Sequence, residues 1–175
     1  HSLKSKSSLF FFFSSQAKPP QLLAHYDFPD DWEILLVILD SKNTVNGQKE
    51  VNIFQDYCPV PKNEVEQTSH IIFMNMIPFL LERDLPAFGH SIDEIQKRGF
   101  KNVEVSLQSQ QIRDLMDKLR EIGAYGVGMS SFGPTVYSVF DKNNKHIVEE
   151  IKEYVGSRGI VLTTKAQNYG HEIQK

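Results

Sequence analysis

The sequence predicts an α+β domain: a ferredoxin-like sandwich whose four-stranded, mostly antiparallel sheet carries helices on one face. Three observations lead to this fold class. An apolar, strand-like run precedes several helical stretches, two β-like runs are joined by a short turn, and one more helix leads into a last strand. With 175 residues, the chain is long enough to bury one core of its own.

The chain divides into three parts. Residues 1–31 show no clear periodicity and contain several serines and prolines, so we expect an extended arm. The adjacent phenylalanines Phe10–Phe13 lie in this arm and need an apolar surface to cover them. We assign the folded domain to residues 32–166 and expect residues 167–175 to form a loose tail.

The first strand and the helices that follow it come from the first half of the chain. Trp32–Asp40 is apolar almost throughout, which predicts a central strand. We expect a helix at 48–58, ended by a proline, and a long helical stretch at 62–84. Ile71–Leu81 is apolar on nearly all sides, so we predict that it lies deep in the domain. Pro78 should kink or split this helix.

The remaining helices and the last strand follow in the second half. A helix at 85–99 is expected to end at Gly99 as its C-cap. Further helices are predicted at 106–123 and 144–159, and the last strand at 160–166. The helix at 106–123 is the clearest, because apolar residues recur with helical spacing at Ile112, Leu115, Met116, Leu119 and Ile122.

The composition argues against several function classes. Lys and Arg total 19 and Asp and Glu total 22, and the resulting net charge of −3 gives no support to nucleic-acid binding. No apolar run reaches the length of a membrane span, and Leu9–Phe13 is too short for a signal peptide. Cys58 is the one cysteine, which suits a reducing cytoplasm, and the histidines lie at no ligand spacing. We therefore expect a cytoplasmic protein without a zinc site.

One glycine-rich stretch, GAYGVGMSSFGPTVYSVF, runs from Gly123 to Phe140. Its two ends, Tyr125–Met129 and Thr135–Phe140, alternate like strands, and Gly133-Pro134 would make the turn between them. A plain hairpin is therefore one interpretation.

The second interpretation is a loop that faces an anion. Gly126 and Gly128 lie two residues apart, so they would leave one face of a strand bare. Ser130 and Ser131 would add hydroxyl donors at the tip, and backbone N–H groups there suit a phosphate or pyrophosphate. The residues alone leave both interpretations open.

The same stretch resembles the third conserved motif of the GHMP kinase superfamily, a glycine-rich hairpin commonly written K-x-[ST]-G-[AS]-G-G-G-G. Here SSFGPTVY replaces most of the glycine run. That variant is similar to one branch, the archaeal β-ribofuranosylaminobenzene 5′-phosphate synthases. The phrases HYDFPDDWEILLVI and FGHSIDEIQKRGFKNVE also resemble this branch. The resemblance extends over about residues 1–140.

The resemblance implies a C-terminal half with the ferredoxin-like fold. The N-terminal half of such proteins carries a P-x-x-x-G-L-G-S-S-type motif, which this sequence lacks. Residues 1–31 would then be a linker from a missing N-terminal domain, and the chain alone would be inactive. The complete enzyme would condense phosphoribosyl pyrophosphate with 4-aminobenzoate, with loss of CO₂ and pyrophosphate, in methanopterin biosynthesis.

The resemblance also implies a site. The expected substrate- and phosphate-binding residues are Gly126, Gly128, Ser130, Ser131, Gly133 and Thr135, with Lys4 of the arm as a weaker candidate. Mg²⁺ is expected to accompany pyrophosphate, because hard oxygen ligands suit it. We expect no organic cofactor, and we name neither a general acid or base nor a protein metal ligand.

Two alternatives remain. One is the C-terminal domain of an ATP-dependent GHMP small-molecule kinase, which the SSFGPT loop disfavours because it replaces the glycine run. The other is a non-catalytic module that binds a ligand or dimerises, and the lack of a credible acid–base pair keeps it open. The expected partners are a phosphorylated small molecule, the missing N-terminal half and a second copy in a homodimer. Neither nucleic acid nor a membrane is expected.

Overall fold

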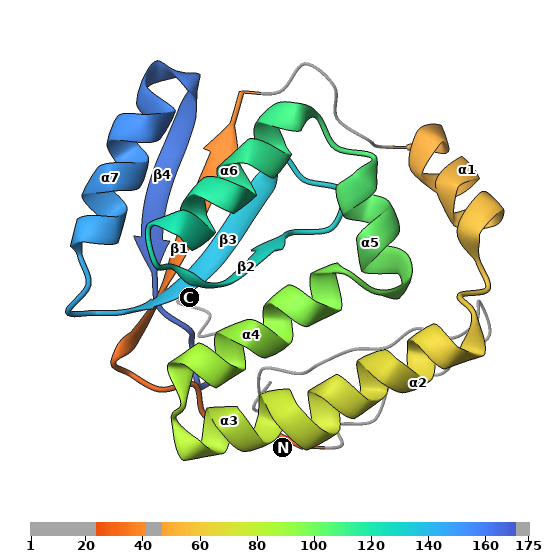
Figure 1. Cartoon of the computed structure of the whole chain (residues 1–175), viewed down its shortest axis with the longest axis horizontal. Coiled ribbons are helices and arrows are strands. Elements are labelled where there is room, and N and C mark those ends of the chain that lie inside the picture. The colour runs from red at the N-terminus through yellow and green to blue at the C-terminus, as the bar shows by residue number, and fades with distance from the viewer. Residues whose placement is uncertain (1–23, 41–46, 171–175) are drawn as a thin grey trace, which may run out of the picture.

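The structure is a computed structural model, and it describes residues 24–40 and 47–170 (Figure 1). Four strands form one sheet in the order β2-β3-β1-β4, and every neighbouring pair is antiparallel. This order, with helices between β1 and β2 and between β3 and β4, is that of a ferredoxin-like sandwich. The predicted fold class is confirmed. The strands are β1 (Trp32–Leu39), β2 (Tyr125–Met129), β3 (Thr135–Asp141) and β4 (Gly159–Thr164).

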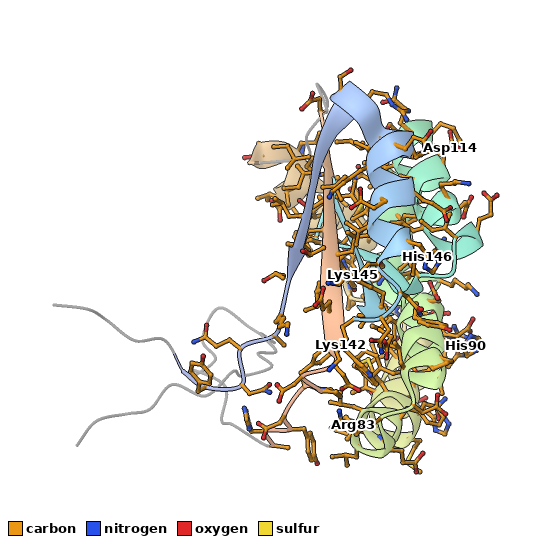
Figure 2. The ribbon with its side chains drawn as sticks, turned by 90° about the vertical axis from the view of Figure 1, so that its left-hand side faces the viewer. Arg83, His90, Asp114, Lys142, Lys145 and His146 are labelled. Atoms are coloured by element: carbon orange, nitrogen blue, oxygen red, sulfur yellow. The ribbon has the colours of Figure 1, made fainter. Side chains whose placement is uncertain are left out.

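The helices fill the two connections. In chain order they are α1 (Gln48–Tyr57), α2 (Lys62–Ile71), the π-helical turn η1 (Ile72–Met76), α3 (Ile77–Glu82), α4 (Leu85–Gln96), α5 (Gly99–Ser106), α6 (Gln110–Glu121), α7 (His146–Val155) and the 3₁₀ turn η2 (Gly156–Arg158). With the sheet seen nearly edge-on, Figure 2 shows α6 and α7 on the same side of it.

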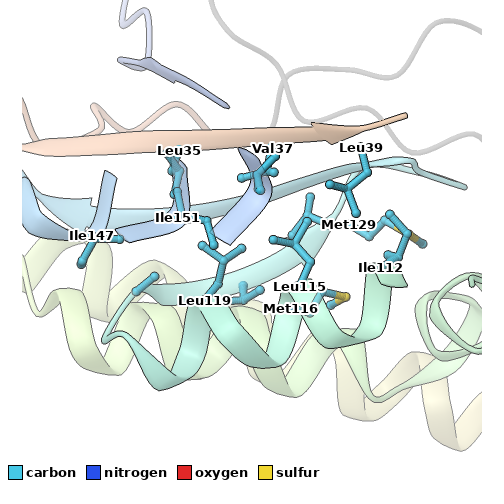
Figure 3. Close-up of a cluster of buried hydrophobic side chains, with 14 of the residues drawn as sticks. Leu35, Val37, Leu39, Ile112, Leu115, Met116, Leu119, Met129, Ile147 and Ile151 are labelled. Carbon is cyan, nitrogen blue, oxygen red and sulfur yellow. The ribbon is translucent and has the colours of Figure 1, made fainter. Parts of the chain in front are cut away.

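The main core lies between this helical layer and the inner face of the sheet. Alternate residues of β1, Leu35, Val37 and Leu39, point toward α6 (Figure 3). The predicted apolar face of α6 meets them, with Leu115 and Leu119 fully buried. The helical spacing of that segment and the near-continuous apolar run of β1 therefore identified the two sides of this core correctly.

The outer face of the sheet is also apolar along β1 and β4. Leu36 lies opposite Leu162, and Ile38 lies opposite Ile160, so these four side chains share the face turned away from α6 and α7. Ile160 and Leu162 are exposed.

A π-helical turn splits the long helix predicted at 62–84. The N–H of Ile77 donates to the carbonyl of Ile72, five residues earlier, just before Pro78. Because proline has no N–H and its ring displaces the carbonyl four residues back, a wider turn at this point accommodates it. The predicted burial of this segment is wrong: Phe73, Met74 and Leu81 are 57%, 62% and 58% exposed.

The helix predicted at 85–99 ends early, and a further helix follows it. Helix α4 begins after Asp84, whose carboxylate accepts a hydrogen bond from the N–H of Ala87 at 3.0 Å. It ends at Gln96, and Gly99, predicted as its C-cap, instead begins α5. Helix α5 was not expected from the sequence.

The two ends of the domain are held together. Phe28 packs edge-on against Trp32, with ring centroids 5.4 Å apart. The side-chain amide of Asn168 accepts from the N–H of Phe28 and donates to its carbonyl, both at 2.9 Å. Of the tail that we expected to be loose, residues 167–170 are described, and Asn168 is anchored in this way. Lys4 and Phe10–Phe13 lie outside the described residues.

Candidate functional site

The glycine-rich stretch forms the hairpin of β2 and β3, and its tip brings four of the predicted site residues together. The N–H of Ser130 donates to the carbonyl of Thr135 at 2.9 Å, and the N–H of Gly133 donates to the carbonyl of Ser130 at 2.9 Å. Ser131 and Gly133 have φ values of 46° and 70°, in the left-handed region. We call residues 130–135 the tip loop.

The outward groups of the tip loop are polar. Ser130 and Ser131 are exposed, and Thr135 is partly exposed. Among residues 24–40 and 47–170, none makes a hydrogen bond with the hydroxyl groups of these three residues. These hydroxyls are therefore available as donors to a ligand oxygen. That they bind phosphate stays a prediction.

Phe132 anchors the tip loop in the domain. Its ring is buried and lies edge-on to Phe54 and Phe100, at centroid distances of 5.9 and 5.8 Å. The latter two rings stack on one another at 4.5 Å. The carbonyl of Phe132 accepts a hydrogen bond from Nε2 of Gln108 at 2.8 Å. An aromatic side chain in the middle of the loop thus holds the two serines at the surface.

Side chains of α4 and α5 complete the hydrogen bonding of Met129, the last residue of β2. Gln96 accepts from its N–H through Oε1 at 3.1 Å, and Lys101 donates to its carbonyl through Nζ at 2.9 Å. Lys101 also pairs with the buried carboxylate of Glu104 at 2.6 Å. Because β2 is an edge strand, these side chains take the place of a neighbouring strand.

Sequence reasoning missed Gln96, Lys101, Glu104 and Gln108. Gln96, Lys101 and Gln108 lie 24 to 33 residues from Met129 or Phe132, to which they bind, and Glu104 pairs with Lys101. The one signal in the sequence was polar residues at positions that continue an apolar helix face, as Gln96 does after Ile92.

The bare strand face predicted at Gly126 and Gly128 does not exist, and this expectation is corrected. Gly126 has φ 59° and lies in a β-bulge, where an added Cβ would come within 2.8 Å of Cδ1 of Ile92. An added Cβ on Gly128 would overlap the ring of Tyr137. Both glycines are buried, so they make room for neighbouring protein groups rather than for a ligand. Gly133, in contrast, belongs to the tip loop itself.

Two titrating groups near the hairpin have shifted pKa values. Burial raises the pKa of Tyr137, and the carboxylates of Asp93 and Glu104 raise it further, so its hydroxyl stays protonated. Hydrogen bonds from Lys97 and Arg98 lower the pKa of Glu94 from 4.5 to about 2.

An apolar groove lies beside the tip loop. It has a volume of about 620 Å³ and runs between α1 and α2 on one side and α5 on the other. Phe54, Val65, Phe73 and Phe100 line it, and Arg98 and Lys101 contribute cationic groups. The one carboxylate among the described residues that line it, that of Glu64, accepts a hydrogen bond from the N–H of Gly99 at 3.1 Å. Phe54 and Phe100 are the two residues that hold Phe132, so the groove and the tip loop share a wall.

The described residues contain no group of three or more His, Cys, Asp or Glu side chains placed to hold a metal ion. In the same part of the chain, no helix is both long and apolar enough to cross a membrane.

Comparison with known proteins places this domain. Residues 76–160 match the family described as GHMP kinases, C terminal. Over 97% of the chain, the sequence is 45% identical to β-ribofuranosylphenol 5′-phosphate synthase of Methanothermobacter thermautotrophicus, covering 51% of that protein. It is also 45% identical over 91% of the chain to the protein of the same name from Methanocaldococcus jannaschii, covering 48% of it.

A solved structure agrees on the fold. Homoserine kinase from Cytophaga hutchinsonii superposes with a TM-score of 0.58 over 82% of this chain and 44% of that chain, at 15% identity. Residues 76–160 therefore carry a GHMP kinase C-terminal domain. The whole chain is similar to the archaeal β-ribofuranosylphenol 5′-phosphate synthases, and it spans about half the length of these relatives.

Proposed function

We propose that this chain is the C-terminal half of a synthase that joins the ribose of phosphoribosyl pyrophosphate to the ring of an aromatic acid, with loss of pyrophosphate and CO₂. The observation that carries the proposal is the 45% identity, over 97% of the chain, to an enzyme named for a ribofuranosylphenol 5′-phosphate product. A kinase role has weaker support, because the likeness to homoserine kinase at 15% identity concerns the fold alone.

The proposed reaction requires hydrogen-bond donors for phosphate oxygens, and the tip loop contains exposed hydroxyl groups. Departure of pyrophosphate leaves a sugar with oxocarbenium character, and a ring carbon attacks it before CO₂ leaves. The protein must hold phosphate oxygens, place a flat ring and exclude water. The hydroxyls of Ser130, Ser131 and Thr135 would donate to the phosphate oxygens. Each hydrogen bond to a charged oxygen is worth about 1.5–3 kcal/mol.

The acceptor is proposed to be 4-aminobenzoate, which would place the reaction in methanopterin biosynthesis. The relatives are named for a phenol product, so the hydroxylated analogue is the natural second acceptor to compare. Mg²⁺ would accompany pyrophosphate in solution, but the described residues offer no set of protein ligands for it, and we derive no step through it.

The first prediction tests this function on a full-length enzyme that contains the chain. With phosphoribosyl pyrophosphate and 4-aminobenzoate or 4-hydroxybenzoate, we expect equal amounts of pyrophosphate and CO₂, measured with a coupled phosphate assay and a ¹⁴C-carboxyl label. ATP-dependent phosphorylation of a small alcohol without release of CO₂ would contradict the proposal. The 175-residue chain alone is expected to show no turnover.

A further inference from the structure

The groove beside the tip loop has the features of a site for an aromatic ring. Its volume of about 620 Å³ lies within the range of about 300–1,000 Å³ typical of small-molecule sites. Its walls include the rings of Phe54, Phe73 and Phe100. Phe54 and Phe73 are exposed, so their surfaces are open to a ligand. Aromatic rings pair in stacked or edge-on geometry at centroid distances of about 4.5–7 Å.

The position of the groove fits a two-part substrate. Phe132 touches two of the groove walls, at 5.9 Å from Phe54 and 5.8 Å from Phe100. Ser131 is its neighbour in sequence, and consecutive Cα atoms lie about 3.8 Å apart. Phe132 therefore connects the walls of the groove to the tip loop, and a substrate that carries both a ring and a phosphate would bind across it.

Arg98, one of the two cationic side chains of the groove, has an N–H group that is not used in a hydrogen bond within the described residues. Arg98 binds Glu94 through Nη1 at 2.7 Å and Gln67 through Nε at 3.3 Å. Its Nη2 has no hydrogen-bond partner within the described part of the chain. The second cation, Lys101, is already engaged with Glu104 and the carbonyl of Met129. A guanidinium N–H at the edge of an apolar groove suits a carboxylate on the bound ring.

From these observations we propose that the groove between α1, α2 and α5 binds a single aromatic ring bearing a carboxylate. The ring stacks against the phenylalanines, and Arg98 holds the carboxylate. This site rests on the proposed synthase function, because it supplies the place of the acceptor. The proposal concerns binding alone, so it is testable on this chain without turnover.

The second prediction is a binding experiment on the 175-residue chain. Benzoate, 4-hydroxybenzoate and 4-aminobenzoate are titrated into ¹⁵N-labelled protein, and amide shifts are followed by NMR. We expect saturable shifts centred on Val65, Phe73 and Phe100. Cyclohexanecarboxylate, which lacks the aromatic face, and phenol, which lacks the carboxylate, should each bind at least fivefold more weakly.

Matched variants locate the site. Val65→Trp fills the groove and is expected to weaken binding of the aromatic acids at least tenfold. Leu162→Trp introduces the same side chain at a residue of similar exposure (48%, against 44% for Val65) on the outer face of the sheet, and should leave binding unchanged. Arg98→Lys should weaken benzoate more than phenol. The fold of each variant is checked from its NMR spectrum.

Three outcomes would overturn the site. Shifts that do not saturate at the groove, or that centre elsewhere, exclude it even if the full-length enzyme is a synthase. Equal effects of the two tryptophan variants also exclude it. A chain that light scattering shows to be a dimer, and that Val65→Trp alone makes monomeric, assigns the groove to a second copy. If the full-length enzyme has no synthase activity but aromatic acids bind saturably in the groove of this chain, the proposed function is wrong and the proposed binding site stands.

Discussion

Individual residues of the hairpin are fixed by close packing rather than by ligand chemistry. Gly128 and Tyr137 lie opposite each other on paired strands, and the ring of the tyrosine occupies the space over the glycine. Such a pair lets an aromatic ring lie flat on its neighbouring strand. Gly128, which the sequence pattern assigned to a bare strand face, is therefore a glycine because the ring of Tyr137 in β3 occupies the space above it.

The third prediction concerns this contact. Gly128→Ala places a methyl group into the ring of Tyr137 and should lower the free energy of unfolding by about 1–3 kcal/mol, the usual cost of overpacking. Urea denaturation followed by circular dichroism measures it.

Gly156→Ala serves as a control for this variant, because no atom lies within 4 Å of its added Cβ. Its cost should come only from the backbone, since φ 53° and ψ −130° are rarely adopted by residues other than glycine, at about 1–3 kcal/mol. If Gly128→Ala leaves stability unchanged, the packing described here is wrong.

The fourth prediction follows from the lowered pKa of Glu94. In the folded chain this pKa is about 2, against 4.5 for the free group. The pairs with Lys97 and Arg98 therefore contribute stability above pH 4.5, and this contribution is lost as the pH falls toward 2. Glu94→Gln should make stability less dependent on pH in this window, as measured by thermal unfolding at a series of pH values. An unchanged slope would contradict the assignment.

At the scale of elements, helices α4 and α5 control the position of the tip loop. Gln96 and Lys101 complete the hydrogen bonds of Met129, and Gln108, just after α5, binds the carbonyl of Phe132. Phe100 of α5 packs on the same phenylalanine. The loop is thus oriented by a segment that ends before α6 begins.

The fifth prediction tests this control. Lys101→Met removes the hydrogen bond to the carbonyl of Met129, together with the partner of Glu104, and Gln108→Ala removes the hydrogen bond to the carbonyl of Phe132. The double variant removes both hydrogen bonds. Amide hydrogen exchange at Ser130 and Gly133, whose N–H groups donate within the hairpin, should quicken about thirtyfold in the double variant, since each lost bond weakens local closure by about 1 kcal/mol. Exchange at Leu115, in the main core, should stay unchanged. Equal acceleration at both places would mean that the variants loosen the whole domain.

The elements also show what sequence patterns can predict. Helix α6 and strand β1 follow from the sequence, because each carries an uninterrupted apolar pattern with the period of its own geometry. Helix α5 does not, since its one strongly buried residue is Glu104. The pattern of residues 71–81 predicts burial wrongly for the opposite reason: the run is apolar, but Phe73 and Met74 of η1 and Leu81 of α3 lie at the surface.

At the scale of the whole molecule, the fold class and the location of the tip loop were predictable, and its surroundings were not. The order of strands and helices along the chain determines the ferredoxin-like topology. The groove depends on α1 meeting α5 through the stacked rings of Phe54 and Phe100, which are 46 residues apart. No local pattern encodes a contact of that kind. Lys4, the remaining candidate, lies outside the described residues.

The side-chain amide of Asn168 ties the end of the domain to its beginning through two hydrogen bonds with the backbone of Phe28. The chain enters β1 and leaves β4 at the same end of the sheet, since Ile34 lies opposite Thr164. The described chain therefore enters and leaves the sheet at one end, a layout typical of domains that tolerate insertion into a larger chain. The tip loop lies at the opposite end of β3, next to the end of β1. A domain joined to the start of β1 or the end of β4 would therefore have to extend along the length of the sheet to contact the tip loop.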